Sequence, residues 1–193
     1  MVRLSMSAEV HQFLSATIKP GDSVIDATLG NGHDTLFLAE HVGEEGHVFG
    51  FDIQAGAVNN SLKQLVTHQL DHRATLMMKS HVYMADLIPE QFHGHIKCVM
   101  FNLGYLPGSD KSVITLPEST LSALNIALNL LAEDGIISIL AYSGHPGGAD
   151  ECSAVKAWAS QLPRDGYRAS VIDLLSSHRS PPEWILISRT QML

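Results

Sequence analysis

The stretch SVIDATLGNGHDTLFLAEHV, residues Ser23–Val42, contains the first strand, turn and helix that the sequence predicts. Ser23–Thr28 is a short, mainly apolar run, which indicates a buried strand. A turn with two glycines follows, and residues 34–42 have the pattern of a helix with an acid near its positive N-terminal end. A strand that passes through a turn into a helix is the repeating element of a parallel α/β sheet.

The same alternation of strand and helix continues along the chain. Short apolar runs predict further strands at 47–52, 74–80, 97–103, 136–142, 168–175 and 183–190. Helical spacing predicts helices at 7–18, 55–70, 117–135 and 149–162. Pro117 lies in the first turn of the third of these helices, and Gly135 is expected at its end.

These elements predict an α/β, Rossmann-like, doubly wound fold. Most of the expected strands are continuously apolar, as in parallel sheets that are covered on both faces. The last two strands are joined by a short connection, which favours an antiparallel hairpin. We therefore expect a mostly parallel seven-stranded sheet with an antiparallel last strand, the arrangement of class I S-adenosylmethionine (SAM) methyltransferases.

The composition favours one globular domain, residues 1–193, in the cytoplasm. The chain has neither an apolar run long enough to cross a membrane nor a signal-peptide core, and Cys98 and Cys152 form no CxxC pair. His93 and His95 have no suitably spaced cysteine or acid, so no metal site is expected. The net charge of -8 argues against broad binding of nucleic acid. Four arginines late in the chain form either a local basic rim or an ordinary solvated surface: Arg164, Arg168, Arg179 and Arg189.

The turn after the first strand and the acid after the second indicate a nucleotide-like cofactor. Ligands bind beyond the C-terminal ends of the strands in such sheets. The glycines of the turn either let the backbone approach a ligand closely or serve the turn geometry alone. Asp52 ends the second predicted strand about twenty residues beyond the glycines, where a carboxylate can accept both ribose hydroxyls.

The acids near the turn distinguish SAM from a dinucleotide. A dinucleotide fingerprint requires glycine where this chain has Thr35. Asp26 and Asp34 would repel a pyrophosphate but could balance the ammonium or the sulfonium of SAM, and Asp26 is equally compatible with capping the turn. The predicted cofactor contacts are Asp26, Thr28, Gly30, Asn31, Gly32, Asp34, Thr35, Asp52, Gln54 and Asn102.

The stretch CVMFNLGYLPGSD, residues Cys98–Asp110, indicates where the chemistry occurs. The fourth strand lies beside the first in this fold, so Asn102 at its end would face the methyl group of SAM. The Asn102 amide oxygen and the Leu103 carbonyl could hold the N–H groups of an amine, with Gly104 allowing the turn and Tyr105 stacking on a base or shielding the site. Such positioning lowers the barrier to in-line methyl transfer. The alternative is that Asn102 only caps a turn.

Two later loops supply candidate substrate contacts. AYSGHPGG follows the fifth strand and places Tyr142, His145 and Gly147 at the same edge of the sheet, unless it is only a glycine-rich turn with a solvated histidine. SSHRSPP joins the last two strands, and His178 and Arg179 there either meet RNA or belong to a plain hairpin loop.

The strings DATLGNGHDTLFLA, FDIQ, FNLGYLPGSDKSVIT and AYSGHPGGADE together resemble the putative rRNA methylase family of class I SAM-dependent methyltransferases. They occur in that order between Asp26 and Glu151. The resemblance implies SAM as cofactor and methylation of the 5-aminomethyl group of 5-aminomethyl-2-thiouridine at the wobble position of tRNA. It also implies contact with the anticodon region and favours a homodimer. NLGY is similar to the N-P-P-Y motif of amino-methylating enzymes, with Leu-Gly in place of Pro-Pro.

Three other functions are compatible with the same residues. The acceptor could be rRNA or a small-molecule amine instead of tRNA. The chain could also be a SAM-binding module without catalysis, or, least in keeping with its acids, a dinucleotide oxidoreductase.

Overall fold

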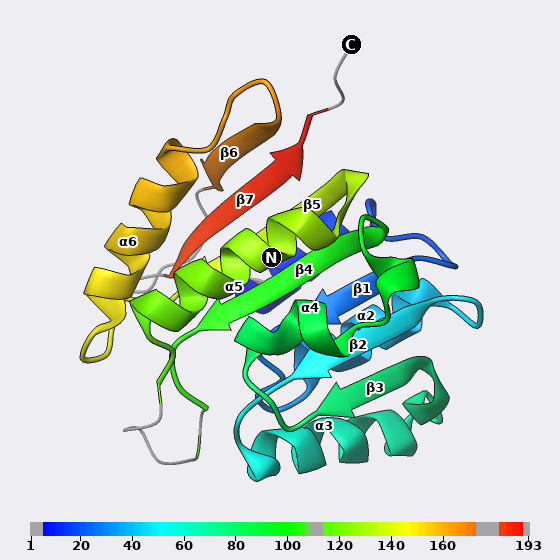
Figure 1. Cartoon of the computed structure of the whole chain (residues 1–193). Helices are drawn as coiled ribbons and strands as arrows, with labels where there is room; N and C mark the ends of the chain where they lie inside the picture. The colour runs from blue at the N-terminus through cyan, green and yellow to red at the C-terminus, as the bar shows by residue number, and fades with distance from the viewer. Residues whose placement is uncertain (1–5, 107, 109–113, 173–181, 191–193) are drawn as a thin grey trace, which may run out of the picture.

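The computed structural model describes residues 6–106, 108, 114–172 and 182–190, and within them strands and helices alternate as the sequence predicts (Figure 1). The strands are β1 (Ser23–Asp26), β2 (His47–Phe51), β3 (Ala74–Met77), β4 (Ile96–Leu103), β5 (Leu131–Ala141), β6 (Tyr167–Ile172) and β7 (Glu183–Arg189). The helices are α1 (Met6–Leu14), α2 (His33–Val42), α3 (Ala55–Thr67), α4 (Met84–Leu87), α5 (Pro117–Leu130) and α6 (Gly148–Ser160).

The strands form one seven-stranded sheet in the order β3-β2-β1-β4-β5-β7-β6. Neighbouring strands from β3 to β5 are parallel, whereas β7 is antiparallel to both β5 and β6. The predicted fold class is therefore confirmed, including the antiparallel last strand. The sheet order reverses between β1 and β4, and their C-terminal ends define the crevice in which ligands bind in such sheets.

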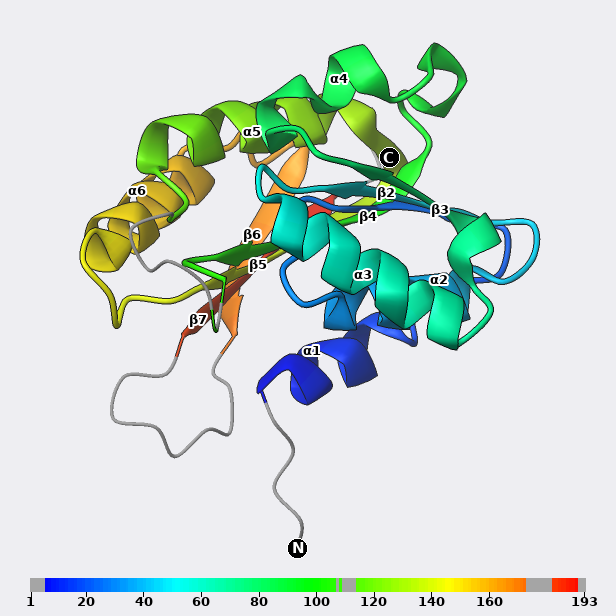
Figure 2. The ribbon, with the colours of Figure 1, turned by 90° about the horizontal axis from the view of Figure 1, so that it is seen from below.

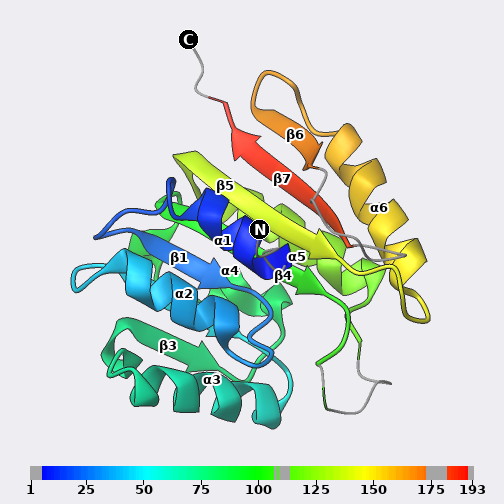
Figure 3. The same ribbon diagram turned by 180° about the vertical axis from the view of Figure 1, so that it is seen from behind.

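Helices cover both faces of the sheet (Figure 2). On one face lie α4, α5 and α6, and on the other lie α1, α2 and α3. Side chains alternate between the two layers, so that Ile25 of β1 belongs to the core under α5 and Val24 to the core under α1 and α2. Figure 3 shows α1 lying over the sheet beside α2. This placement brings α1 close to the reversal point.

The structure differs from the sequence-based boundaries around Gly135. The helix predicted to reach Gly135 ends at Leu130, and β5 starts at once with Leu131 paired to Ile96. A side chain at Gly135 would place its Cβ 2.8 Å from the Ile96 carbonyl oxygen. The glycine is thus required by the close approach of two strands, not by the end of a helix.

The segment between β3 and β4 also differs from expectation. It contains α4 and two short 3₁₀ turns, at His81–Tyr83 and Glu90–Phe92. Elements of three or four residues are too short to show a helical period, so periodicity could not predict them. Among the residues that the structure describes, no helix is long and apolar enough to cross a membrane.

Candidate active site

A cavity of about 390 Å³ lies at the C-terminal edge of the sheet, within the size range of small-molecule sites. The turn after β1, the ends of β2 and β4 and the loops after β3 and β5 all contribute to its wall. It includes these residues that the sequence predicted as functional: Thr28, Gly30, Asn31, Asp34, Asp52, Gln54, Asn102, Leu103, Gly104, Tyr105, Tyr142 and His145. The cavity thus brings together the predicted cofactor and acceptor residues, which are far apart in the chain.

Four predicted residues do not line this cavity, and two lie outside the described part of the chain. Asp26, Gly32, Thr35 and Gly147 are absent from its wall. Gly147 has a φ of 83° at the start of α6, where glycine is favoured for conformational reasons. His178 and Arg179 lie outside the described residues.

The two glycines of the first turn have different surroundings. Both have positive φ, 54° at Gly30 and 81° at Gly32. A Cβ on Gly32 would lie 2.6 Å from Cα of Ser61, so this glycine lets α2 and α3 pack closely. A Cβ on Gly30 would meet nothing closer than 3.8 Å. Gly30 is therefore the glycine that leaves room for a ligand beside the backbone.

The Asp52 carboxylate is held at the cavity wall by two backbone groups. The N–H of Gly30 donates to its Oδ2 at 3.2 Å, and the N–H of Gln54 donates to its Oδ1 at 2.9 Å. An ionised carboxylate can accept about four hydrogen bonds, so two more can be accepted from a ligand. This fixed pair of acceptors suits the two hydroxyls of a ribose.

Asp26 shapes the turn from inside the protein. It is fully buried, its Oδ1 accepts the N–H of Thr28 at 3.1 Å, and its Oδ2 accepts the hydroxyl of Thr35 at 2.6 Å. Burial, with a smaller contribution from the nearby Asp34 charge, raises the pKa of Asp26 to about 7. Crowded acids of this kind favour a cation in the adjoining cavity and disfavour a pyrophosphate.

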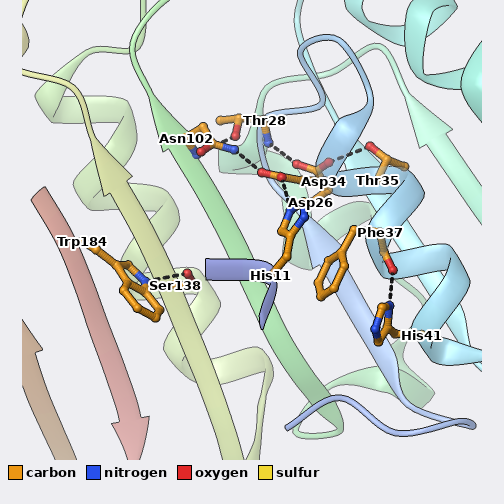
Figure 4. Close-up of polar contacts among 10 residues, drawn as sticks. All are labelled: His11, Asp26, Thr28, Asp34, Thr35, Phe37, His41, Asn102, Ser138 and Trp184. Carbon is orange, nitrogen blue, oxygen red and sulfur yellow. Dashed lines mark hydrogen bonds and ion pairs between the residues drawn. The ribbon is translucent and has the colours of Figure 1, made fainter. Parts of the chain in front are cut away.

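Asn102 is held by two polar contacts at the end of β4 (Figure 4). Its backbone N–H donates to Oγ1 of Thr28 at 2.7 Å. Its side-chain NH₂ donates to Oδ2 of Asp34, and Oδ1 of Asp34 is 2.6 Å from Nε2 of His11. The Asn102 amide is therefore part of a network that reaches from β4 through α2 to α1.

The residues after Asn102 are already joined to the neighbouring loops. The Leu103 carbonyl accepts the N–H of Tyr142 at 3.1 Å, which leaves one of its lone pairs for an acceptor amine. The Gly104 carbonyl accepts the N–H of Thr115 at 2.9 Å. Tyr105 meets His145 edge to face, with ring centroids 5.7 Å apart. These contacts form one wall beside Asn102.

Sequence reasoning missed several residues of the cavity, and His81 is the most informative of them. It is 8% exposed, and its Nδ1 lies 3.1 Å from the Ala27 carbonyl, to which it must donate. Its Nε2 is then an acceptor, and it has no hydrogen-bond partner among the described residues. Burial lowers the pKa of His81, which favours the neutral ring. The signal in the sequence is its position just after β3, since ligands bind beyond the C-terminal ends of the strands.

The first helix contributes further residues that the sequence did not reveal. Ser7 lines the cavity and makes a side-chain hydrogen bond with Tyr142. Burial raises the pKa of Tyr142, and the Asp34 charge adds to the effect. His11, from the same helix, contacts Asp34. No group of three or more metal-ligating side chains occurs in the described ranges.

The polar groups and the free space of the cavity fit SAM. Asp52 offers acceptors for a ribose, and Gly30 offers open space beside the backbone. The acids near the turn suit a molecule that carries an ammonium and a sulfonium. When bound, SAM would supply an electrophilic methyl group, and the end of β4 offers polar groups to an acceptor beside it.

Comparisons with known proteins agree with this geometry. Residues 48–188 match the family described as Putative rRNA methylase, and residues 2–86 match protein-L-isoaspartate(D-aspartate) O-methyltransferase. A chloroplastic tRNA (mnm(5)s(2)U34)-methyltransferase of Arabidopsis thaliana is 38% identical over 179 residues. That alignment covers 89% of this chain, but the chain spans only 65% of the plant protein.

Solved structures show the same similarity over the whole chain. A putative rRNA methylase from Clostridium thermocellum is 38% identical with a TM-score of 0.90, covering 98% of this chain and 100% of that one. A putative methyltransferase from Streptococcus mutans in complex with S-adenosylhomocysteine (SAH) is 29% identical with a TM-score of 0.83. The match covers 98% of this chain and 99% of that one.

Proposed function

The chain belongs to the putative rRNA methylase family of class I SAM-dependent methyltransferases, and from this membership we propose that it transfers a methyl group from SAM to an amine carried by tRNA. The resemblance seen in the sequence motifs is confirmed, as is the assignment to a family of SAM-dependent enzymes. The SAH complex of the Streptococcus mutans relative supports SAM as the cofactor of this chain.

The proposed acceptor is the 5-aminomethyl group of 5-aminomethyl-2-thiouridine at the wobble position, in the anticodon region of tRNA. The name of the Arabidopsis relative supports this acceptor. An aliphatic amine also fits the NLGY sequence, because it needs less rigid clamping than a ring amine. rRNA or a small-molecule amine is the alternative acceptor for the same site.

The observation that carries the proposal is the position of Asn102 in the cavity wall. It lies near the C-terminal end of β4 at the point where the sheet order reverses, and its side-chain NH₂ is bound to Asp34. The amide oxygen is then the atom left to accept an N–H of the acceptor amine. The Leu103 carbonyl has one lone pair for a second N–H.

In this mechanism the protein acts mainly by positioning. Asn102 and Leu103 hold a neutral amine so that its lone pair points at the methyl carbon. The nitrogen lone pair forms the new C–N bond while the C–S bond breaks, and the electron pair of that bond stays on sulfur. SAH would be the second product, and the proton released from the methylated nitrogen would go to the solvent. Asp52 would hold the ribose of SAM throughout.

The test uses tRNA from a strain that lacks this protein. The tRNA is incubated with the purified protein and SAM, and its nucleosides are analysed by mass spectrometry. We expect 5-aminomethyl-2-thiouridine to gain one methyl group. Asn102→Ala should lose most of the turnover with little loss of SAM affinity, and Asp52→Ala should mainly lose SAM affinity. Methylation of rRNA or of a free amine instead would favour the alternative acceptor.

A homodimer is part of the same proposal. The net charge of -8 leaves little positive charge for phosphate contacts on one copy. Two copies could build one RNA site from local basic surfaces. Light scattering with and without tRNA tests this point, and a monomer in both conditions would contradict it.

A further inference from the structure

We propose that Asp34 is a positioning residue that fixes the direction of the Asn102 amide, and that His11 of α1 holds Asp34 in place. The catalytic role of this network of His11, Asp34 and Asn102 rests on the proposed methyl transfer. Its existence can be tested without that reaction.

The direction of the amide follows from the donors and acceptors present. An ionised carboxylate only accepts hydrogen bonds, so Asp34 must face the NH₂ group of Asn102 and not its oxygen. Asn102 Oδ1 is thereby turned away from Asp34. An unrestrained amide could rotate and present NH₂ to the acceptor amine, which would repel its N–H groups. Asp34 therefore selects the Asn102 rotamer in which Oδ1 can accept an N–H of the acceptor amine.

The position of Asp34 is fixed from its other side by His11. Nε2 of His11 lies 2.6 Å from Asp34 Oδ1, and the imidazole stacks on Phe37 with centroids 4.0 Å apart and planes 3° from parallel. The Asp34 side chain is 9% exposed and the His11 side chain 21%. Water has little access to this pair, so the contact holds the carboxylate more firmly than a surface ion pair would.

The network makes the docking of α1 a condition for an ordered acceptor site. Val10 and Leu14 are buried against the sheet, and this packing fixes the helix that carries His11. Ser7, one turn earlier, makes a side-chain hydrogen bond with Tyr142 at the same cavity. Helix α1 thus contacts Asp34, which binds Asn102 at the end of β4, and also Tyr142 after β5 (Figure 4 shows the contacts of Asp34).

The competing role for Asp34 is a direct contact with the cofactor, because it also lines the cavity. His11 is absent from the cavity wall, so a His11 variant separates the two roles. If Asp34 acts through Asn102, His11→Ala changes turnover and not cofactor binding. If Asp34 binds the cofactor, loosening it weakens SAH binding.

The experiment compares His11→Ala, His11→Gln and the matched control His41→Ala. His41 contacts Phe37 from the other side, with centroids 4.3 Å apart, but has no contact with Asp34 among the described residues. We expect His11→Ala to lower kcat about tenfold with the SAH dissociation constant within about twofold of wild type. The amide of His11→Gln can still donate to Asp34 and should restore part of kcat. His41→Ala should leave both quantities unchanged.

A double-mutant cycle identifies the path of the effect. If His11 acts through Asn102, His11→Ala should have little further effect on kcat in an Asn102→Ala background. Additive losses, an unchanged kcat in His11→Ala, or an SAH affinity that falls as much as kcat would each overturn the proposal.

A second readout keeps the inference separate from the proposed function. The side-chain amide signals of Asn102 in an NMR spectrum can be assigned by their loss in Asn102→Ala. We expect them to shift in His11→Ala and to stay in place in His41→Ala. Asn102 amide signals that do not shift in His11→Ala would refute the network even if the protein methylates tRNA. A protein that shows the shift but methylates no tRNA would retain the network and lose the function.

Discussion

Replacing Asp26 by asparagine should change how the stability of the fold depends on pH. In the folded chain, burial and then the Asp34 charge raise the Asp26 pKa from an ordinary 3.8 to about 7. The unfolded carboxyl loses its proton near its ordinary pKa, whereas the folded one keeps it. As pH rises from about 4 to about 7, the unfolded state is therefore favoured increasingly, and above about 7 the effect is constant.

The size of this effect follows from the pKa difference. A rise of the pKa from 3.8 to about 7 lowers the unfolding free energy at high pH by at most about 4 kcal/mol. Asp26→Asn carries no ionisable group there and should escape this loss. The variant should have a lower unfolding free energy from a second cause, which acts at every pH. An amide has only one acceptor oxygen for the two contacts with Thr28 and Thr35.

The assay is urea denaturation of wild type and Asp26→Asn across the range from about pH 4 to about pH 9. The unfolding free energy of the variant should rise relative to that of wild type as pH rises to about 7. Above about pH 7 the difference should stay constant. Thr35→Val is the matched control, since the Thr35 hydroxyl lowers the Asp26 pKa and its loss should extend the change to higher pH. A constant difference in unfolding free energy between variant and wild type at all pH values would show that burial does not raise the pKa of Asp26 in the folded chain.

Three further predictions concern residues in and around the site. Gly32→Ala should reduce the unfolding free energy by well over the strain of about 1 kcal/mol expected at either glycine, because its Cβ would meet Ser61. Gly30→Ala should mainly weaken SAH binding, and equal stabilities of the two variants in urea would contradict this difference. Glu151 is 1% exposed and accepts two threonine hydroxyls at 2.6 Å each, so Glu151→Gln should cost about 1–3 kcal/mol of unfolding free energy, and an unchanged urea midpoint would argue against this. His81→Leu should leave the chain folded but lower kcat/KM for methyl transfer, because it removes from the cavity an acceptor nitrogen that has no partner among the described residues; an unchanged kcat/KM would mean that the ring only packs.

The fold could be predicted because its information is local. Each strand of the parallel part is a short apolar run, and each helix of two turns or more shows its own period. The rule that ligands bind beyond the strand ends then placed Asp52 and Asn102 at one cavity, although 50 positions separate them in the chain. Gly135 was misjudged because a glycine beside an opposing carbonyl looks, in sequence, like a glycine that ends a helix.

The polar network behind the site could not be predicted from the sequence. His11 and Asp34 are 23 positions apart, and their contact depends on how α1 packs over the sheet. Neither residue carries a pattern that pairs it with the other. The tautomer of His81 depends in the same way on the contact of its Nδ1 with the Ala27 carbonyl, 54 positions earlier. Contacts of this kind arise from tertiary packing, which periodicity does not record.

A crystal structure with SAH and an anticodon stem-loop that carries the 5-aminomethyl group would show directly whether Asn102 holds the acceptor amine. We expect SAH in the cavity with its ribose on Asp52. Oδ1 of Asn102 should lie about 2.7–3.2 Å from the acceptor nitrogen, and that nitrogen should face the sulfur. An Asn102 amide that turns its oxygen into the protein, or SAH bound outside this cavity, would contradict the account.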